Sequence, residues 1–219
     1  MSASSSQPAQ KASTSPVDPY KHIAPVYDLV AAAYLRGMHG RMAEMCERYG
    51  VRRILDAGCG TGLLTSRLSR SFPFVVGLDL SQAMLRRAQG KRTAVQPFSL
   101  VRGSALELPF APGTFDAVTY SLMLHEVEGR PAERMLDAGF SLAPLLFVLE
   151  WCSPERNLDY LFTSWSHGVE FMAGQEHYRN FKAFMRRGGI HGLARRVGAT
   201  VKEAIPLRMG SFILTVLER

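Results

Sequence analysis

The sequence is poor in cysteine and has no long apolar run. Its 219 residues include three cysteines, Cys46, Cys59 and Cys152, and no C-x-x-C pair. This set provides neither a disulfide framework nor a zinc site of the usual spacing, so we expect a reducing, cytoplasmic setting. No window approaches the roughly 20 apolar residues of a membrane-spanning helix, and residues 1–19 lack the apolar stretch of a secretory signal. We therefore expect a protein that is neither held together by disulfides nor exported by that route.

The first 19 residues also lack side chains that could form a core. They are almost all Ser, Ala, Pro, Gln and Thr, and they contain none of the Arg expected of an organellar transit peptide. We predict a disordered tail over residues 1–19. We assign residues 20–219 to a single domain, because 219 residues are too few for separate cofactor and substrate domains.

Acidic residues are scarce in the first half of the chain, and this scarcity accounts for the whole net charge of +7. Residues 1–110 carry 14 basic and 7 acidic side chains, whereas residues 111–219 carry 12 of each. A basic excess is typical of nucleic-acid proteins, but the arginine pairs fall on expected helices and no RNA-binding module accompanies them. We expect a small-molecule partner rather than nucleic acid. Peripheral contact with an anionic membrane surface stays open, as does the oligomeric state.

Short apolar runs alternate with amphipathic stretches, which predicts strands and helices around a largely parallel sheet. The expected strands are residues 53–57, 74–79, 98–102, 115–120, 145–151, 200–205 and 212–217. The expected helices are residues 24–36, 38–49, 62–69, 82–88, 131–143 and 189–197, with a further helical pair at 155–186. The aromatic residues of an insert at about 153–187 suit either a substrate lid or ordinary packing against the sheet, and both interpretations stand.

One run carries most of the chemical information: Ile54-Leu55-Asp56-Ala57-Gly58-Cys59-Gly60-Thr61-Gly62. A buried strand ends in an acidic residue and turns through three alternate glycines into a helix. Glycine permits positive φ and lets a ligand approach the backbone, and the start of a helix offers unpaired N–H groups. A dinucleotide fingerprint would need a third glycine where Leu63 stands, so the spacing does not favour NAD.

A second acidic residue, Asp79, ends the next expected strand. A carboxylate at this place can accept hydrogen bonds from both hydroxyls of a ribose. Together with Asp56, two positions before the first glycine, it predicts an adenosine-containing ligand without a pyrophosphate bridge. The ligand is expected at the carboxyl ends of the strands.

At these residues the sequence resembles the class I S-adenosylmethionine-dependent methyltransferases, especially the small enzymes similar to ubiquinone and menaquinone biosynthesis methyltransferases. The resemblance is strong over residues 54–126 and looser over 20–28 and 145–219. The stretch 103–110 looks like the family's G-D-A-x-x-L-P-F, with Ser104 in place of the Asp, and the stretch 20–28 is similar to its Y-x-x-I-A-x-x-Y-D opening. The resemblance implies a Rossmann-like α/β fold. Its features would be a seven-stranded, mostly parallel sheet with an antiparallel last strand, helices on both faces, N-terminal helices and a helical lid insert.

The resemblance also implies S-adenosylmethionine as the cofactor, and it can be carried over residue by residue. The glycine loop would hold the methionine part through Asp56, Gly58, Cys59, Gly60 and Gly62. Asp79 would bind the ribose. The remaining expected cofactor contacts are Leu80 and Met84 beside the adenine, Ser104, Ala105 and Leu106 near its amino group, Ser121 beneath the sulfur, and Tyr27 at the carboxylate.

His125 is the candidate catalytic residue. An imidazole with a pKa near neutrality can remove a proton from an acceptor O–H, N–H or C–H group. The same residue would also suit a capping or core position, and this alternative stays open. His167 and His177 show no carboxylate–histidine spacing that resembles a metal site, so no metal is expected.

The expected function is methyl transfer from S-adenosylmethionine to a small, partly apolar acceptor. The net charge suggests a nucleic-acid methyltransferase as an alternative, but the Asn/Asp-Pro-Pro-aromatic run typical of amino-methylating enzymes is replaced by Ser121-Leu122-Met123-Leu124. A third hypothesis is a protein that binds the cofactor without turnover, and Ser104 is its only support.

Overall fold

The structure is a computed structural model, and it describes residues 24–95, 97–127, 129–152, 175–208 and 210–219. The expected tail at 1–19 and the first part of the expected lid, 153–174, lie outside the described residues. The assignment of residues 20–219 to one domain stays a prediction.

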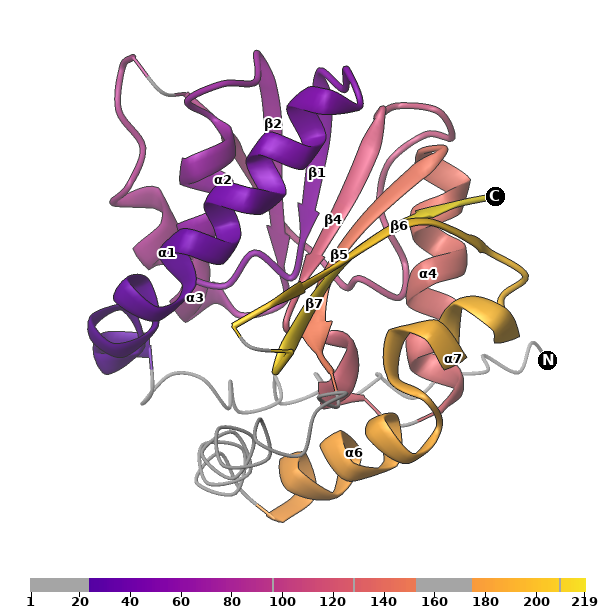
Figure 1. Ribbon diagram of the computed structural model, residues 1–219. Helices are drawn as coiled ribbons and strands as arrows, with labels where there is room; N and C mark the ends of the chain where they lie inside the picture. Colours follow the sequence, from indigo (N-terminus) through magenta and orange to yellow (C-terminus); the bar gives the residue numbers. More distant parts are fainter. Residues whose placement is uncertain (1–23, 96, 128, 153–174, 209) are drawn as a thin grey trace, which may run out of the picture.

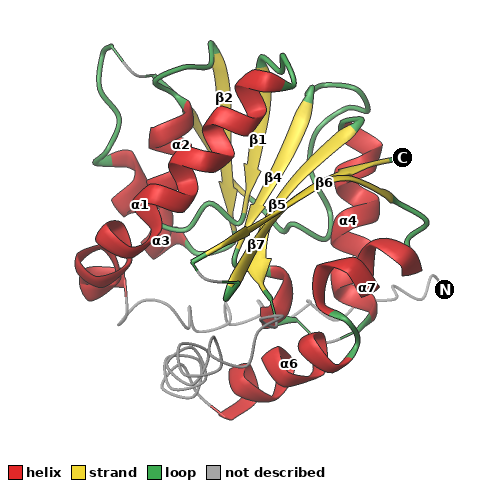
Figure 2. Ribbon diagram, viewed as in Figure 1, coloured by secondary structure: helices red, strands yellow, loops and turns green. Residues whose placement is uncertain are grey.

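A seven-stranded sheet forms the centre of the molecule, in the order β3-β2-β1-β4-β5-β7-β6 (Figures 1 and 2). β1 pairs in parallel with β2 and β4, β2 with β3, and β4 with β5, whereas β7 is antiparallel to both β5 and β6. The mostly parallel sheet with an antiparallel last strand is therefore confirmed. The strands are β1 (Arg53–Ala57), β2 (Phe74–Asp79), β3 (Ser99–Arg102), β4 (Ala117–Ser121), β5 (Leu145–Trp151), β6 (Thr200–Leu207) and β7 (Phe212–Glu218).

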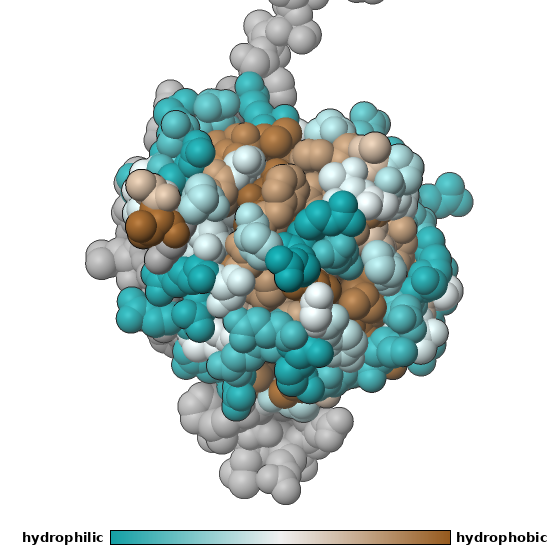
Figure 3. Space-filling view, turned by 90° about the horizontal axis from the view of Figure 1, so that it is seen from above, coloured by the Kyte–Doolittle hydropathy of each residue, from teal (hydrophilic) through white to brown (hydrophobic). Residues whose placement is uncertain are grey.

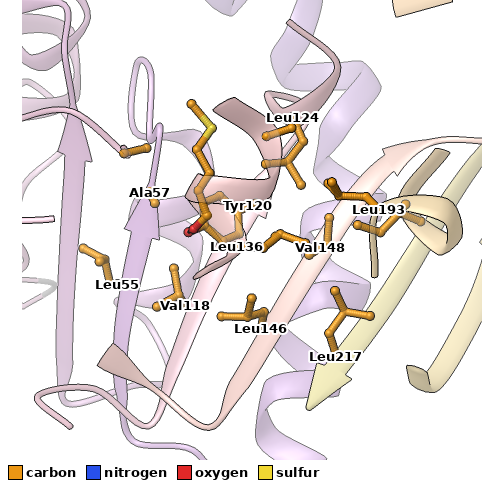
Figure 4. Packing of buried hydrophobic residues seen from close by; sticks show 14 of the residues in the cluster. Leu55, Ala57, Val118, Tyr120, Leu124, Leu136, Leu146, Val148, Leu193 and Leu217 are labelled. Atoms are coloured by element: carbon orange, nitrogen blue, oxygen red, sulfur yellow. The ribbon is translucent and has the colours of Figure 1, made fainter. Parts of the chain in front are cut away.

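Helices cover both faces of the sheet because the strands are buried on both sides. One apolar cluster joins α1 (Ala24–Arg48) and α2 (Leu63–Leu68) to one face. The other cluster joins α4 (Arg130–Leu142) and α7 (Gly189–Arg196) to the opposite face, and Figure 4 shows its side chains lying between strands and helices. α3 (Gln82–Gln89) packs against the start of α2. A Cβ atom on Gly62, the residue before α2, would lie only 2.8 Å from the Cβ of Ala88 on α3.

Two elements lie beyond the carboxyl ends of the parallel strands. The short helix η1 (Leu124–Glu126) follows β4, and α6 (Gln175–Arg186) runs below the sheet in Figure 1. The Asn180 side-chain amide on α6 donates a hydrogen bond of 2.7 Å to the Glu126 carbonyl oxygen. This contact fixes η1 against α6 at the edge where a ligand is expected.

The expectation of two short helices before Gly50 is wrong, because α1 is one continuous helix of 25 residues. Leu35, Met38, Met42 and Met45 are all buried and recur at helical spacing across Gly37. A glycine in a helix interior costs only about 1 kcal/mol relative to alanine. Burial of this apolar stripe outweighs that penalty, so Gly37 does not end the helix.

The other expected elements in the described part are present, with ends that shift by one or two residues. The fourth strand begins at Ala117 rather than at residue 115, because the Phe115 backbone N–H donates to the Leu142 carbonyl oxygen outside the sheet. Among the described residues, no helix is both long and apolar enough to cross a membrane.

Candidate functional site

The glycine loop joins the carboxyl end of β1 to the start of α2, and its backbone explains the glycines. Gly58, Gly60 and Gly62 have φ values of 72°, 52° and 77°. Other residues rarely adopt such values. A Cβ atom on Gly60 would meet nothing within 4 Å, so the middle of the loop faces open space. A ligand can therefore come close to the backbone at Gly60, whereas the place of a side chain at Gly62 is taken by α3.

Gly58 has a different neighbour, which the sequence did not reveal. A Cβ atom on Gly58 would lie 2.3 Å from the Sδ atom of Met123, in the segment between β4 and η1. The preceding residue, Leu122, has a φ of 54°, which is unusual for a non-glycine residue. This turn brings the segment after β4 into contact with the first glycine.

Asp79 at the end of β2 is tied directly to the glycine loop. Its Oδ2 atom accepts a 2.8 Å hydrogen bond from the Gly60 backbone N–H, and its Oδ1 atom accepts one of 2.8 Å from the Ser81 N–H. A carboxylate oxygen accepts more than one hydrogen bond. Asp79 therefore orients the loop and is also placed to bind ligand hydroxyls.

The residues that follow Asp79 differ in exposure. Leu80 is 67% exposed, although it is a large apolar side chain beside a charged one. Met84 is buried, and its backbone N–H donates to the Ser81 hydroxyl, which caps α3. An exposed leucine at this edge suits the flat apolar face of an adenine, whereas Met84 lies in the interior.

Asp56 is almost fully buried and holds the end of β1 to its neighbours. Its Oδ2 atom accepts a 2.6 Å hydrogen bond from the Thr65 hydroxyl of α2, and its Oδ1 atom accepts one of 3.0 Å from the Thr119 hydroxyl of β4. Burial raises the pKa of Asp56 to about 6. These contacts give Asp56 a positioning role in the loop, and its direct contact with a cofactor stays a prediction.

Cys59 is buried beneath the loop. A Cβ atom on Gly77 of β2 would lie 3.0 Å from its Sγ atom, so the thiol points toward the sheet. Burial, with the nearby carboxylates of Asp56 and Asp79, raises the pKa of the Cys59 thiol. A thiol of this kind is protonated and unreactive at neutral pH.

The segment after β3 lies beside Asp79. The Gly103 backbone N–H donates a 3.0 Å hydrogen bond to the Asp79 carbonyl oxygen. The Ser104 hydroxyl accepts a 3.2 Å hydrogen bond from the Leu106 N–H, and Ala105 is buried. The structure therefore brings the expected adenine contacts 104–106 to the same edge as Asp79.

Ser121 ends β4 and has a partner that the sequence analysis missed. The Nε2 atom of His39, on α1, lies 3.1 Å from the Ser121 hydroxyl oxygen. Burial lowers the pKa of His39 to about 4, so its imidazole is neutral at physiological pH. Tyr27 also lies in α1, but its side chain is outside what the structure describes.

His125 forms a buried pair with a carboxylate that the sequence analysis did not identify. Its Nδ1 atom lies 2.7 Å from Oε2 of Glu150, on β5, and both side chains are nearly inaccessible to solvent. The other oxygen of Glu150 accepts a 2.7 Å hydrogen bond from the Leu124 N–H. A single acidic residue inside the apolar run 145–151 is the sequence feature that could have indicated it.

Aromatic rings of α6 lie beside the histidine of this pair. The His125 ring meets the rings of His177, Phe181 and Phe184 on α6, with centroids 5.4, 6.1 and 6.4 Å away. Their planes are steeply inclined, as in edge-to-face packing. The site therefore has a polar side at the glycine loop and an aromatic side at α6.

Comparison with known proteins agrees with this arrangement. A family profile described as "Methyltransferase domain" matches residues 54–142, which run from β1 to the end of α4. The class I methyltransferase family is S-adenosylmethionine-dependent, and the match covers the glycine loop, Asp79 and His125. Residues 54–142 are therefore similar to the methyltransferase domain family, and the chain spans 59% of the length of the first curated methyltransferases that it matches.

Individual relatives match this chain to different extents. An uncharacterized methyltransferase of Mycobacterium tuberculosis is 35% identical over 118 residues, which are 53% of this chain and 59% of that protein. A 2-phytyl-1,4-naphtoquinone methyltransferase of Thermosynechococcus vestitus is 27% identical over 91% of this chain and 97% of its own length. An O-methyltransferase family protein of Burkholderia thailandensis has the same fold, with a TM-score of 0.69 and 16% identity over 90% of this chain and 59% of its own.

The molecule also has a surface groove of about 590 Å³, but it lies at the other end of the sheet. Residues that line it, Val51, Arg52 and Pro73, come just before β1 and β2. Figure 3 views this end of the molecule, where hydrophilic and hydrophobic residues alternate over the surface. The groove is thus separate from the glycine loop, and the carboxyl edge is the candidate active site.

Proposed function

We propose that this protein is a methyltransferase that moves a methyl group from S-adenosylmethionine to a small, partly apolar acceptor at the carboxyl edge of the sheet. The observation that carries the proposal is the buried His125–Glu150 pair, which is walled by aromatic rings and lies after the strand next to the glycine loop. A polar cofactor site and an apolar acceptor site therefore adjoin.

The residues present fit the cofactor. The open backbone at Gly60 leaves room for its methionine part, the Asp79 carboxylate suits its ribose hydroxyls, and exposed Leu80 suits its adenine. When bound, the cofactor supplies a methyl group that its sulfonium makes electrophilic. The task of the chain is then to hold donor and acceptor in line and to exclude water.

His125 is the residue proposed to act on the acceptor. Both oxygens of Glu150 accept hydrogen bonds from backbone N–H groups, those of Leu124 and Trp151, so we assign Nδ1 of His125 as a further donor to this carboxyl group. Nε2 is then the ring atom that accepts a proton from the acceptor. Glu150 fixes the ring and stabilises the imidazolium that results.

The aromatic wall indicates the acceptor class. Edge-to-face rings of α6 provide flat apolar surface, and such pockets bind ring compounds with few polar groups. The naphthoquinone that names one relative is a compound of this kind, so we infer a quinol-like or other hydroxylated ring acceptor rather than nucleic acid. The three free cysteines favour the cytoplasm as its place of action.

Replacing Asp79 by Ala tests the cofactor site. We expect Asp79→Ala to abolish S-adenosylmethionine binding in calorimetry, because both the ribose acceptor and the anchor of the Gly60 N–H are lost. Glu44→Ala on α1, an exposed acidic residue, is the matched control and should bind as the parent does. Undiminished affinity in a folded Asp79→Ala variant would refute the assignment.

Turnover tests the acceptor side. With a panel of hydroxylated ring compounds, we expect formation of S-adenosylhomocysteine, and His125→Ala should slow it by about 10²- to 10⁴-fold at unchanged cofactor affinity. Cofactor binding without conversion across the panel would instead favour a binding protein. An equal rate in His125→Ala would exclude His125 from catalysis.

A further inference from the structure

The geometry points to a divalent transition-metal site formed by His125, Glu126 and His177, with zinc as the ion that this ligand set suits. The sequence analysis expected no metal, because His167 and His177 show no carboxylate–histidine spacing that resembles a metal site, and it did not pair His177 with His125. The fold brings them together, since His125 and Glu126 belong to η1 and His177 to α6. One ligand atom from each of the three side chains lies within 4.8 Å of the others.

The distances are close to those that a bound ion requires. Zinc–nitrogen bonds are about 2.0–2.1 Å, so two ligands of one tetrahedral ion lie about 3.4 Å apart. The three atoms thus need to approach by up to about 1.4 Å, on the scale of a side-chain rotation. Glu126 and His177 are partly exposed, which leaves room for this adjustment.

Glu150 supplies the support that metal-binding histidines usually have. A histidine ligand commonly donates its other ring N–H to a carboxylate, which fixes the tautomer and the direction of the ring. His125 makes this contact through Nδ1 to buried Glu150, so Nε2 is the atom assigned to the ion. The Asn180 hydrogen bond to the Glu126 carbonyl oxygen holds the two ligand-bearing elements together.

The ligand types select the class of ion. Two imidazoles and one carboxylate suit zinc and similar transition metals, whereas calcium and magnesium prefer oxygen ligands. Three protein ligands leave one position for a further oxygen, as in catalytic rather than structural zinc sites. A bound ion would take the acceptor hydroxyl in this position and lower its pKa, so that the proton could pass to solvent water and His125 would not be needed as the base. This role rests on the proposed function, whereas metal binding does not.

Cobalt titration tests the site on the full chain. After dialysis against a chelator, we expect one Co²⁺ per chain, with a visible absorption band that zinc abolishes by competition. Glu150→Gln should weaken binding by about 10- to 100-fold through the loss of ligand orientation. His177→Ala and Glu126→Gln should weaken it more, because each removes a ligand.

His191→Ala is the matched control, because His191 is an exposed histidine on the neighbouring helix α7. It should bind cobalt as the parent does. Absence of a cobalt band in the parent, or equal binding by His177→Ala and the parent, would overturn the site. Circular dichroism and S-adenosylmethionine binding, recorded on the same samples, separate this outcome from unfolding and from failure of the proposed function.

Discussion

Asp56 and His39 are both buried ionisable residues, and burial moves their pKa values in opposite directions. The pKa of Asp56 rises from 3.8 to about 6, and that of His39 falls from 6.5 to about 4. Each shift corresponds to about 3 kcal/mol of free energy. Their effects on stability therefore oppose each other over the same pH range.

The pH dependence of the free energy of unfolding should reveal the two residues when each is replaced. Folded Asp56 holds its proton more tightly than the unfolded chain does, so its contribution is present below pH 3.8 and is lost as pH rises to about 6. The contribution of His39 is present above pH 6.5 and is lost as pH falls to about 4. Relative to the parent, we expect stability to rise more steeply with pH in Asp56→Asn and less steeply in His39→Gln. Denaturant unfolding at pH 4 to 7 measures this.

The double variant Asp56→Asn, His39→Gln is the control, because it lacks both groups and should follow the slope of the parent. Gln retains an amide that can bond to Ser121, so packing changes little at residue 39. Three parallel curves for the parent and the single variants would contradict the prediction.

Sequence reasoning identified the residues that carry chemistry in a local pattern. Asp79 and the glycines follow strands directly, so their place at the sheet edge is set by a few neighbouring residues. Sequence reasoning did not identify the roles of Glu150, His39 and Met123, because the partners of these residues come from distant segments of the chain. The sheet order and the helix packing bring each residue to its partner. The role of His177 could not be predicted for the same reason. Its spacing from His167 in the sequence says nothing about its contact with His125, which depends on how α6 packs against η1.

At the scale of elements, the first helix is the clearest difference between expectation and structure. The alternation of strands and helices was predictable, because strands and helices each have their own apolar period, and all seven expected strands are present. The continuity of α1 was not predictable, because a glycine within a helical pattern is compatible with either a break in the helix or a continuous helix. Burial of the apolar side chains from Leu35 to Met45 against the sheet keeps the helix continuous.

Alanine at Gly37 tests the continuity of α1. A Cβ atom there would meet nothing within 4 Å, so Gly37→Ala should stabilise the protein by about 0.5–1 kcal/mol. For a chain of this size that is a rise of about 1–4 °C in Tm. Gly50→Ala is the contrasting variant, because φ at Gly50 is 68° and the substitution should lower Tm. A lower Tm for Gly37→Ala would argue for a break at this glycine.

At the scale of the whole molecule, the net charge of +7 is the feature most open to misreading. Several basic side chains have local partners: Arg53 pairs with Asp116, Arg196 with Glu133 and Arg219 with Asp137. Lys91 donates to the Thr61 carbonyl oxygen at the glycine loop. These contacts support structure rather than a track for a polyanion.

Binding to nucleic acid should accordingly be weak and non-specific. In fluorescence anisotropy with a labelled RNA or duplex DNA, we expect no saturable binding near physiological salt, and weak binding at low salt that falls steeply as salt is added. Polyglutamate, an anion without bases, should compete as well as nucleic acid does. Sequence-dependent binding that persists in salt would revive the nucleic-acid hypothesis.

The antiparallel strand β7 has a consequence for the order in which the molecule opens. Among the described strands, β6 pairs with β7 alone, so the two form a hairpin that docks on β5 in one long-range step. The glycine loop and Asp79 depend on β1, β2 and β4, whereas Glu150 lies on β5 opposite Ile213 of β7. Release of this hairpin would therefore expose amides around Glu150 to hydrogen exchange while those of the glycine loop stay protected. The acceptor side of the site thus depends on the hairpin, whereas the cofactor side can stay folded after the hairpin is released.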